Sequence, residues 1–152
     1  MLKYLFLGFS ISLGSWIFGM LFNAIFMKTK YYDRFSNLNF IRSRSLNKIM
    51  GIEYFRWIIK NSFFRFFNQK IKLENKSVDL NEIRKEMTIA EVSHLIAFLL
   101  VSVFAVYKSL SDGVMAGMLI SVGNVLLNLY PSLLQQENKR RLDRLIKRQA
   151  GL

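Results

Sequence analysis

Residues 4–27 read YLFLGFSISLGSWIFGMLFNAIFM and contain no charged side chain. A helix needs about 20 predominantly apolar residues to cross the hydrocarbon core of a bilayer. The run is too long for the apolar region of a cleaved signal peptide, and no pattern of small residues marks a cleavage site at its end. The stretch therefore predicts a retained transmembrane helix and indicates an integral membrane protein.

Two further apolar runs lie in the second half of the chain. Residues 87–107 contain a single acidic residue, Glu91, and residues 113–136 contain no charge at all. The link between them is so short that the two runs must form an antiparallel hairpin, with the turn at residues 111–113, Ser-Asp-Gly. The sequence therefore predicts an all-α fold with three transmembrane helices in one membrane domain, residues 1–152.

The distribution of basic residues predicts the orientation of these spans. The chain has 22 Lys and Arg against 10 Asp and Glu, a net charge of +12. Fourteen of the 22 lie in residues 28–87, and six lie in a basic C-terminal tail, residues 137–152. Three spans place both segments on one side, and the positive-inside tendency makes that side cytoplasmic. We expect a multi-pass cell-membrane protein with its N-terminus outside and its C-terminus in the cytoplasm.

Composition also excludes several classes of function. A basic protein often binds nucleic acid, but here the bases flank apolar runs, as they do beside anionic lipid headgroups. Membrane lipids are therefore expected partners, and nucleic acid is not. The absence of cysteine rules out disulfides and thiolate chemistry. One histidine with one nearby carboxylate is too small a set for a catalytic zinc ion, so we expect no metal site.

Residues 36–72, between the first two spans, combine aromatic and basic side chains. Apolar residues at positions 52, 55, 59, 63, 66 and 67 recur at helical spacing, with bases between them. This pattern is typical of an amphipathic helix that lies in the membrane interface. Two interpretations stay open: the segment is a plain anchor, or it forms a shelf that roofs a lipid-facing site.

The second span carries two ionisable residues at membrane depth. Glu91 and His94 are three residues apart, so they share one helix face. His94 is the only histidine, and imidazole is the side chain best suited to proton transfer near neutral pH. A carboxylate one turn away can orient an imidazole as a general base. The alternative is a Glu–His hydrogen bond that only helps helices pack.

The third span carries a polar stripe. Asn124, Asn128 and Gln135, with small residues between them, follow helical spacing, and Asn138 and Arg141 continue the same face. Asn128 lies at a depth similar to that of His94, so we expect the two to meet across the hairpin. The stripe predicts either a substrate-binding face or amide contacts between helices, with equal weight.

The start of the third span also predicts an association surface. Gly113 and Gly117 form a G-x-x-x-G pair, and Ser121 follows one turn later. Small residues at this spacing allow close helix approach. We therefore expect a homo-oligomer through these three residues.

Two stretches resemble the glycosyl-4,4′-diaponeurosporenoate acyltransferase family, membrane proteins of staphyloxanthin-type carotenoid biosynthesis. Residues 91–94, EVSH, match the family's E-x-x-H at the head of a span. Residues 128–142, NLYPSLLQQENKRRL, match it at Asn128, Gln135, Asn138, Arg141 and Leu142. A weaker likeness runs through residues 31–72. The family's Q-R-Y-N-R reads QQENK here, at residues 135–139, so the chain is identified as a divergent member.

The resemblance implies an acyltransferase that moves a fatty acyl group onto a hydroxyl of a lipid or glycolipid, such as a carotenoid glycoside. An acyl thioester such as acyl-CoA is then the expected co-substrate, and no cofactor is expected. His94, oriented by Glu91, would accept the hydroxyl proton. Substrate contacts would come from Asn124, Asn128, Gln135, Asn138 and Arg141. Of these, Asn128 or Gln135 would donate to the developing oxyanion. Arg141 and the neighbouring bases would hold phosphates of the donor or, equally, only mark the topology. The alternative function is a non-catalytic membrane subunit or scaffold whose polar stripe binds partner helices.

Overall fold

The computed structural model describes residues 1–41, 43–62, 79–149 and 151, and every regular element in this part of the chain is a helix. The predicted all-α fold is confirmed. Three helices are long, counting the last three segments as one continuous helix, and the remaining helices connect the first to the second. The elements are α1 (Leu2–Phe26), α2 (Tyr32–Phe35), α3 (Arg44–Ile49), α4 (Ile52–Asn61), α5 (Leu80–Asp112), α6 (Val114–Asn124), η2 (Val125–Leu129) and α7 (Tyr130–Gln149).

Three stretches of the described chain are long and apolar enough to cross a membrane: α1, α5 and the continuous helix Val114–Gln149. The predicted spans 4–27, 87–107 and 113–136 fall on these three helices. Both helices of the hairpin are longer than predicted. The 33 residues of α5 extend over about 50 Å at 1.5 Å per residue, more than the ~30 Å of a hydrocarbon core. One end of the hairpin must therefore project beyond the apolar layer.

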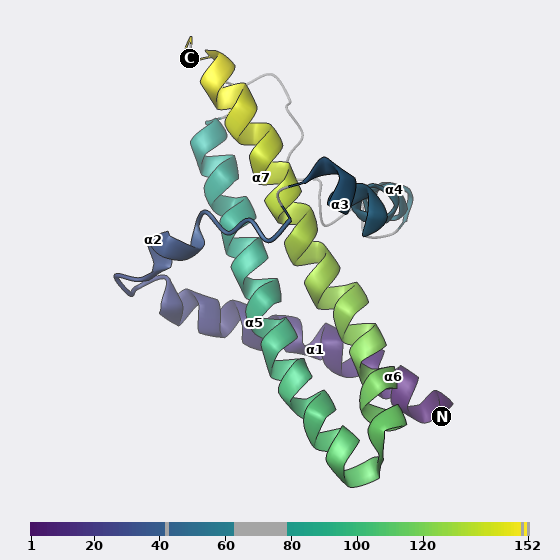
Figure 1. The fold of residues 1–152 in the computed structure, drawn as a ribbon. Coiled ribbons are helices and arrows are strands. Elements are labelled where there is room, and N and C mark those ends of the chain that lie inside the picture. Colours follow the sequence, from purple (N-terminus) through teal and green to yellow (C-terminus); the bar gives the residue numbers. More distant parts are fainter. Residues whose placement is uncertain (42, 63–78, 150, 152) are drawn as a thin grey trace.

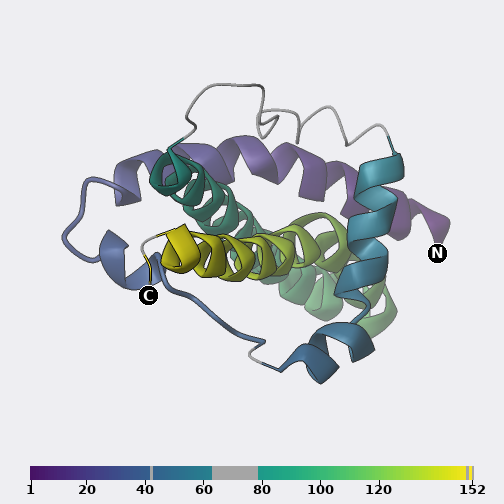
Figure 2. The same ribbon diagram turned by 90° about the horizontal axis from the view of Figure 1, so that it is seen from above.

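The second and third long helices form an antiparallel hairpin, and α1 crosses it (Figure 1). Gly113, with φ +100°, makes the connection between α5 and α6. At the other end, α5 begins after Asp79, whose carboxylate accepts from the Asn81 N–H at 2.8 Å. In the view from above, α4 lies beside α7, and α1 crosses the hairpin on a different face (Figure 2). Phe55 and Ile59 of α4 pack on Leu133 and Leu134 of α7. The predicted interfacial segment is therefore helical in part, and its residues 63–72 lie outside the described residues.

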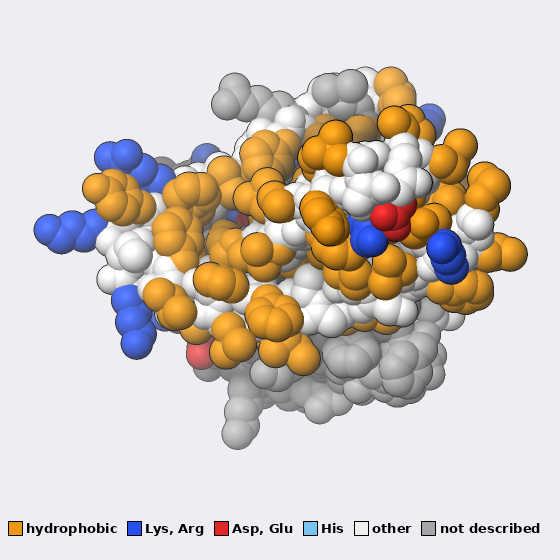
Figure 3. All heavy atoms as spheres, turned by 90° about the horizontal axis from the view of Figure 1, so that it is seen from below, with side chains coloured by type: hydrophobic (Ala, Val, Ile, Leu, Met, Phe, Trp, Pro, Cys, Tyr) orange, Lys and Arg blue, Asp and Glu red, His pale blue; other side chains and the backbone are white. Residues whose placement is uncertain are grey.

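Burial in α1 is the reverse of that in a soluble helix. Its buried residues are all small or polar, and its large apolar side chains, including Phe6, Ile17 and Phe22, are exposed. Seen from the α5–α6 turn, hydrophobic side chains cover much of the surface (Figure 3). An exposed apolar surface of this extent marks contact with lipid or protein. The buried side of α1 consists of Gly8, Ser12, Ser15, Gly19 and Asn23.

Glycines set how closely the helices approach. A Cβ at Gly8 would lie 2.7 Å from the Ile120 Cα, and one at Gly123 would lie 2.7 Å from the Gly8 carbonyl carbon. Gly117 faces Ser109 and Ala105 of α5, so the close approach that it permits is used inside the chain. Gly113 is exposed and Ser121 is half-buried. The expected homo-oligomer through these residues stays a prediction.

Gly8→Ala should destabilise the fold, because its methyl group would push α1 away from the backbone of α6. Overpacking of this kind costs about 1–3 kcal/mol. Gly14→Ala is the matched control on the same helix, since a Cβ there meets nothing within 4 Å. Thermal unfolding of the detergent-solubilised protein measures both. Equal midpoints for the two variants would contradict the close crossing.

Candidate active site

His94 lies on α5 beside a largely apolar cavity of about 430 Å³. Side chains from α1, α4, α5 and the η2–α7 segment enclose it, so the hairpin alone does not build it. Helix α4 contributes apolar side chains that close one side. The lining residues are Trp16, Phe55, Ile58, Ile59, His94, Leu126, Leu127, Pro131, Leu134 and Gln135.

Two polar atoms at this cavity have no partner. His94 Nδ1 and Gln135 Oε1 are buried and accept no hydrogen bond from any described residue. The Trp16 ring meets the His94 ring edge-on, with centroids 5.4 Å apart and planes at 88°. Buried polar groups are rarely left unsatisfied, so such atoms beside a cavity indicate a place for a ligand.

Asn128 lies next to His94, and both of its N–H groups and one lone pair of its amide oxygen are engaged inside the chain. Its Oδ1 accepts from the Trp16 indole at 3.0 Å, and its Nδ2 donates to Ser15 Oγ at 3.2 Å and to Asn124 Oδ1 at 2.9 Å. It also lies within hydrogen-bonding reach of His94. The expected meeting of Asn128 and His94 across the hairpin is thus found. Asn128 belongs to η2, a π-helical turn, which is a rare feature that often occurs at functional sites.

Asn124 extends this network toward α5 and away from the cavity. Its Nδ2 donates to the Phe98 carbonyl and to Ser102 Oγ, each at 3.0 Å. It is almost completely buried. Its polar atoms are therefore satisfied by other helices of the same chain, and it does not line the cavity.

Glu91 and His94 do not pair, and this corrects the expected contact. The Glu91 carboxylate, which is fully buried, forms an ion pair with Lys139 of α7. Between Glu91 and His94, both described, no hydrogen bond or ion pair is present. An ammonium group is the better partner because a buried carboxylate needs a compensating charge. Glu91 therefore ties α5 to α7, one turn from the cavity.

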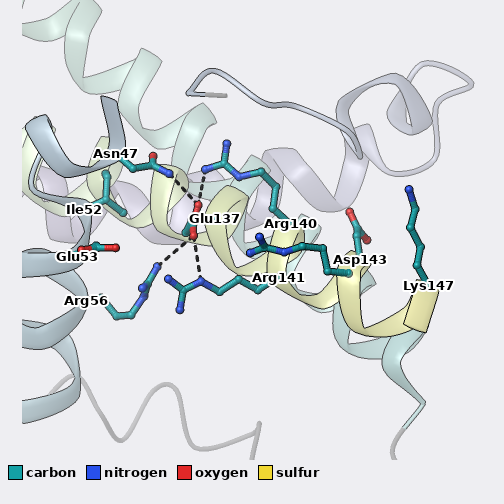
Figure 4. A pocket seen from close by; sticks show the side chains of 10 residues that line it. Asn47, Ile52, Glu53, Arg56, Glu137, Arg140, Arg141, Asp143 and Lys147 are labelled. Atoms are coloured by element: carbon teal, nitrogen blue, oxygen red, sulfur yellow. Dashed lines mark hydrogen bonds and ion pairs between the residues drawn. The ribbon is translucent and has the colours of Figure 1, made fainter. Parts of the chain in front are cut away.

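A second pocket, which we call the basic pocket, lies toward the C-terminal end of α7 (Figure 4). Arg141 lies here and not at the His94 cavity; its Nε donates to Glu137 at 3.0 Å. Asn138 is half-buried and lines neither cavity. Of the predicted substrate-binding residues, only Gln135 lines the cavity beside His94.

Several residues of these sites were not predicted from the sequence. Trp16 and Ser15 come from α1, where small and polar residues at spacings of three and four were a usable signal. Lys139 was grouped with the bases that mark topology, and Arg56 with those of an interfacial helix. The role of Lys139 depends on how α7 packs on α5, and that of Arg56 depends on how α4 packs on α7, which no local pattern indicates.

Together these features indicate a multi-pass type of helical membrane protein, in which a histidine lines a largely apolar cavity. The model of the glycosyl-4,4′-diaponeurosporenoate acyltransferase family matches residues 28–148, most of the chain, and the chain belongs to this family. The match supports an acyltransferase in carotenoid biosynthesis. No curated protein and no solved structure matches the chain. The matched residues include His94 and Gln135 but not Trp16.

Proposed function

We propose that this protein transfers a fatty acyl group from a thioester to a hydroxyl of a lipid or glycolipid, and that the reaction occurs at the His94 cavity. The family description suggests a carotenoid glycoside as acceptor. One observation carries the proposal: His94 lines a cavity whose other walls are almost entirely apolar, and its Nδ1 has no hydrogen-bond partner among the described residues. Such walls suit an acyl chain, and few polar groups then determine the chemistry.

The first step is removal of a proton from the acceptor hydroxyl by His94 Nδ1. Asn128 lies within hydrogen-bonding reach of the imidazole. By accepting from the other ring nitrogen, its amide oxygen would hold the tautomer that leaves the Nδ1 lone pair free. The hydroxyl oxygen then bonds to the thioester carbonyl carbon. When the carbon–sulfur bond breaks, the sulfur leaves as a thiolate and takes the proton back from His94.

Gln135 is the better candidate to stabilise the oxyanion of the tetrahedral intermediate. Both N–H groups of the Asn128 amide already donate inside the chain. The Gln135 amide lines the cavity and makes no hydrogen bond with the described residues. A donor aimed at developing negative charge contributes more in a site from which water is excluded. Asn128 then acts by positioning His94.

The scaffold alternative loses its main support. It required the polar stripe of the third span to face partner helices. Instead, Asn124 and Asn128 are satisfied by α1 and α5 of the same chain. Glu91 is packed away from the cavity, as a structural role requires, but His94 is not. The balance favours the enzyme.

The proposal includes an orientation. We place the basic pocket and the C-terminus in the cytoplasm, where acyl thioesters are made, and the N-terminus outside. The bases of residues 28–87 and 137–152 support this through the positive-inside tendency. Cysteine-accessibility labelling with a membrane-impermeant reagent tests it, since the chain has no cysteine of its own. Leu2→Cys should react from outside intact cells, and Gln149→Cys should react only after permeabilisation.

The activity itself is tested with purified protein in nanodiscs, given a labelled acyl thioester and lipids with free hydroxyls. We expect a labelled ester that forms with multiple turnovers and depends on the protein. Lipid mass spectrometry of cells with and without the protein identifies the acceptor. If no acylated species changes in either experiment, the proposed reaction is wrong.

A further inference from the structure

The basic pocket is a larger hollow than the His94 cavity, at about 640 Å³, and it is lined mainly by charged side chains. Five of its lining residues are cations and three are carboxylates, so the pocket has an excess of positive charge. The residues come from α3, α4 and α7. They are Asn47, Ile52, Glu53, Arg56, Glu137, Arg140, Arg141, Asp143, Arg144 and Lys147.

Internal ion pairs account for only part of this charge. Glu137 accepts from Arg140 at 2.6 Å and from Arg141 at 3.0 Å, as the dashed lines of Figure 4 show. Asp143 is bound by Arg84, which lies outside the pocket, at 2.6 Å. Arg144 and Lys147 have no carboxylate partner among the described residues.

Among the described cations that line the pocket, Arg56 alone has buried nitrogen atoms without a hydrogen-bond partner. Its Nε and one terminal nitrogen are buried and make no hydrogen bond with any described residue, and the nearest carboxylate oxygen, on Glu137, is 4.0 Å away. Burial lowers the pKa of the Arg56 guanidinium, and nearby Arg141 lowers it further, whereas Glu137 and Glu53 oppose this. Leaving buried charged donors without acceptors is costly, so the site is prepared for an anion.

The basic pocket and the His94 cavity follow one another along the same pair of helices. On α4, Phe55 lines the cavity and Arg56 lines the pocket. On α7, Gln135 lines the cavity and Arg141 lines the pocket, six residues or about 9 Å further along the helix. An elongated molecule with an apolar end and an anionic end can therefore occupy both.

We propose that the basic pocket binds the phosphate groups of the acyl donor, and that the donor is consequently a coenzyme A thioester. This inference rests on the proposed function. Guanidinium groups bind phosphates through paired hydrogen bonds, and several of them line this pocket. Cations spaced over Arg140 to Lys147, two turns of α7, suit a nucleotide with several phosphates better than the single phosphate of a lipid headgroup.

Binding measurements test the inference without catalysis. The purified full chain in nanodiscs of zwitterionic lipid is titrated with coenzyme A, with dephospho-coenzyme A and with pantetheine, which has no phosphate. We expect affinity to fall along this series and to weaken with added salt, because charge pairs are screened. Arg56→Gln should weaken coenzyme A binding about tenfold or more, as expected for loss of hydrogen bonds to a charged group. Lys60→Gln, an equal loss of charge on the exposed side of α4, should leave it unchanged.

Three outcomes overturn the inference. One is equal affinity for coenzyme A and pantetheine. Another is an equal loss of affinity for coenzyme A in Arg56→Gln and Lys60→Gln, which would indicate only general charge attraction. The third is that phosphatidylglycerol in the nanodisc abolishes coenzyme A binding by occupying Arg56, which would make the pocket a headgroup site. His94→Ala should bind coenzyme A normally, so failure of the proposed chemistry and failure of this inference give different results.

Discussion

His94→Ala should lower the rate of acyl transfer by about 100- to 10,000-fold, the usual contribution of a positioned general base. His94 Nδ1 is unpartnered beside the apolar cavity, and among the described residues no other side chain that can accept a proton lines it. Without the imidazole, the acceptor hydroxyl has no group to take its proton. The measurement is the initial rate of ester formation by purified protein at saturating donor.

Rescue separates loss of the base from loss of structure. The alanine variant leaves space for an imidazole ring. Added imidazole should therefore restore part of the rate of His94→Ala, whereas it should leave the wild-type rate unchanged. Unfolding midpoints should stay close to that of the wild type, because no described ion pair involves His94. A His94→Ala protein that keeps its full rate would remove the basis of the mechanism.

The departures from the family pattern can be placed in the structure. In the QQENK segment, Gln135 alone faces the His94 cavity. Gln136 accepts from the Phe40 N–H at 2.9 Å, and Glu137 holds the arginines of the basic pocket. Lys139 pairs with Glu91. The altered residues therefore make contacts within the chain, and none of them lines the cavity.

The long-range fold was predictable because transmembrane helices are defined by length and hydropathy alone. The hairpin followed from the short link, and the proximity of His94 and Asn128 followed from their depth. Partners were harder to predict. Glu91 and His94 share one face of α5, which suggested that they pair. The ion-pair partner of Glu91 is instead Lys139, on another helix and 48 positions away. Trp16 reaches Asn128 only because Gly8 and Gly19 let α1 approach so closely.

The part of the basic pocket that α4 contributes could not be predicted, for a related reason. Arg56 and Glu137 come from segments with separate local explanations, an interfacial helix and a basic tail. Only the packing of α4 on α7 brings them together. Net charge predicted that this end of the protein is cationic. It did not predict that two buried nitrogens of one guanidinium would lack hydrogen-bond partners there.

Lys139→Met should be among the most destabilising single substitutions in this chain. The variant removes the ammonium group that neutralises Glu91, whose side chain is 0% exposed, while that of Lys139 is 4% exposed. It also removes the hydrogen bond from Lys139 Nζ to the Ser36 carbonyl at 2.7 Å. Breaking one side of a buried ion pair costs about 3–5 kcal/mol, because the remaining charge is buried without compensation. Arg148→Met, an exposed position on the same helix, is the control and should change stability little.

The double variant Glu91→Leu/Lys139→Met identifies the role of Glu91. Replacing both charges by apolar groups of similar size removes the uncompensated charge, so much of the lost stability should return. If Glu91 only ties α5 to α7, the double variant should also keep most of the transferase rate, because His94, Asn128 and Gln135 remain in place. A double variant that is as stable as the wild type but inactive would instead return Glu91 to the catalytic role that the E-x-x-H pattern predicts. Unfolding midpoints and initial rates measured on the same preparations distinguish these results.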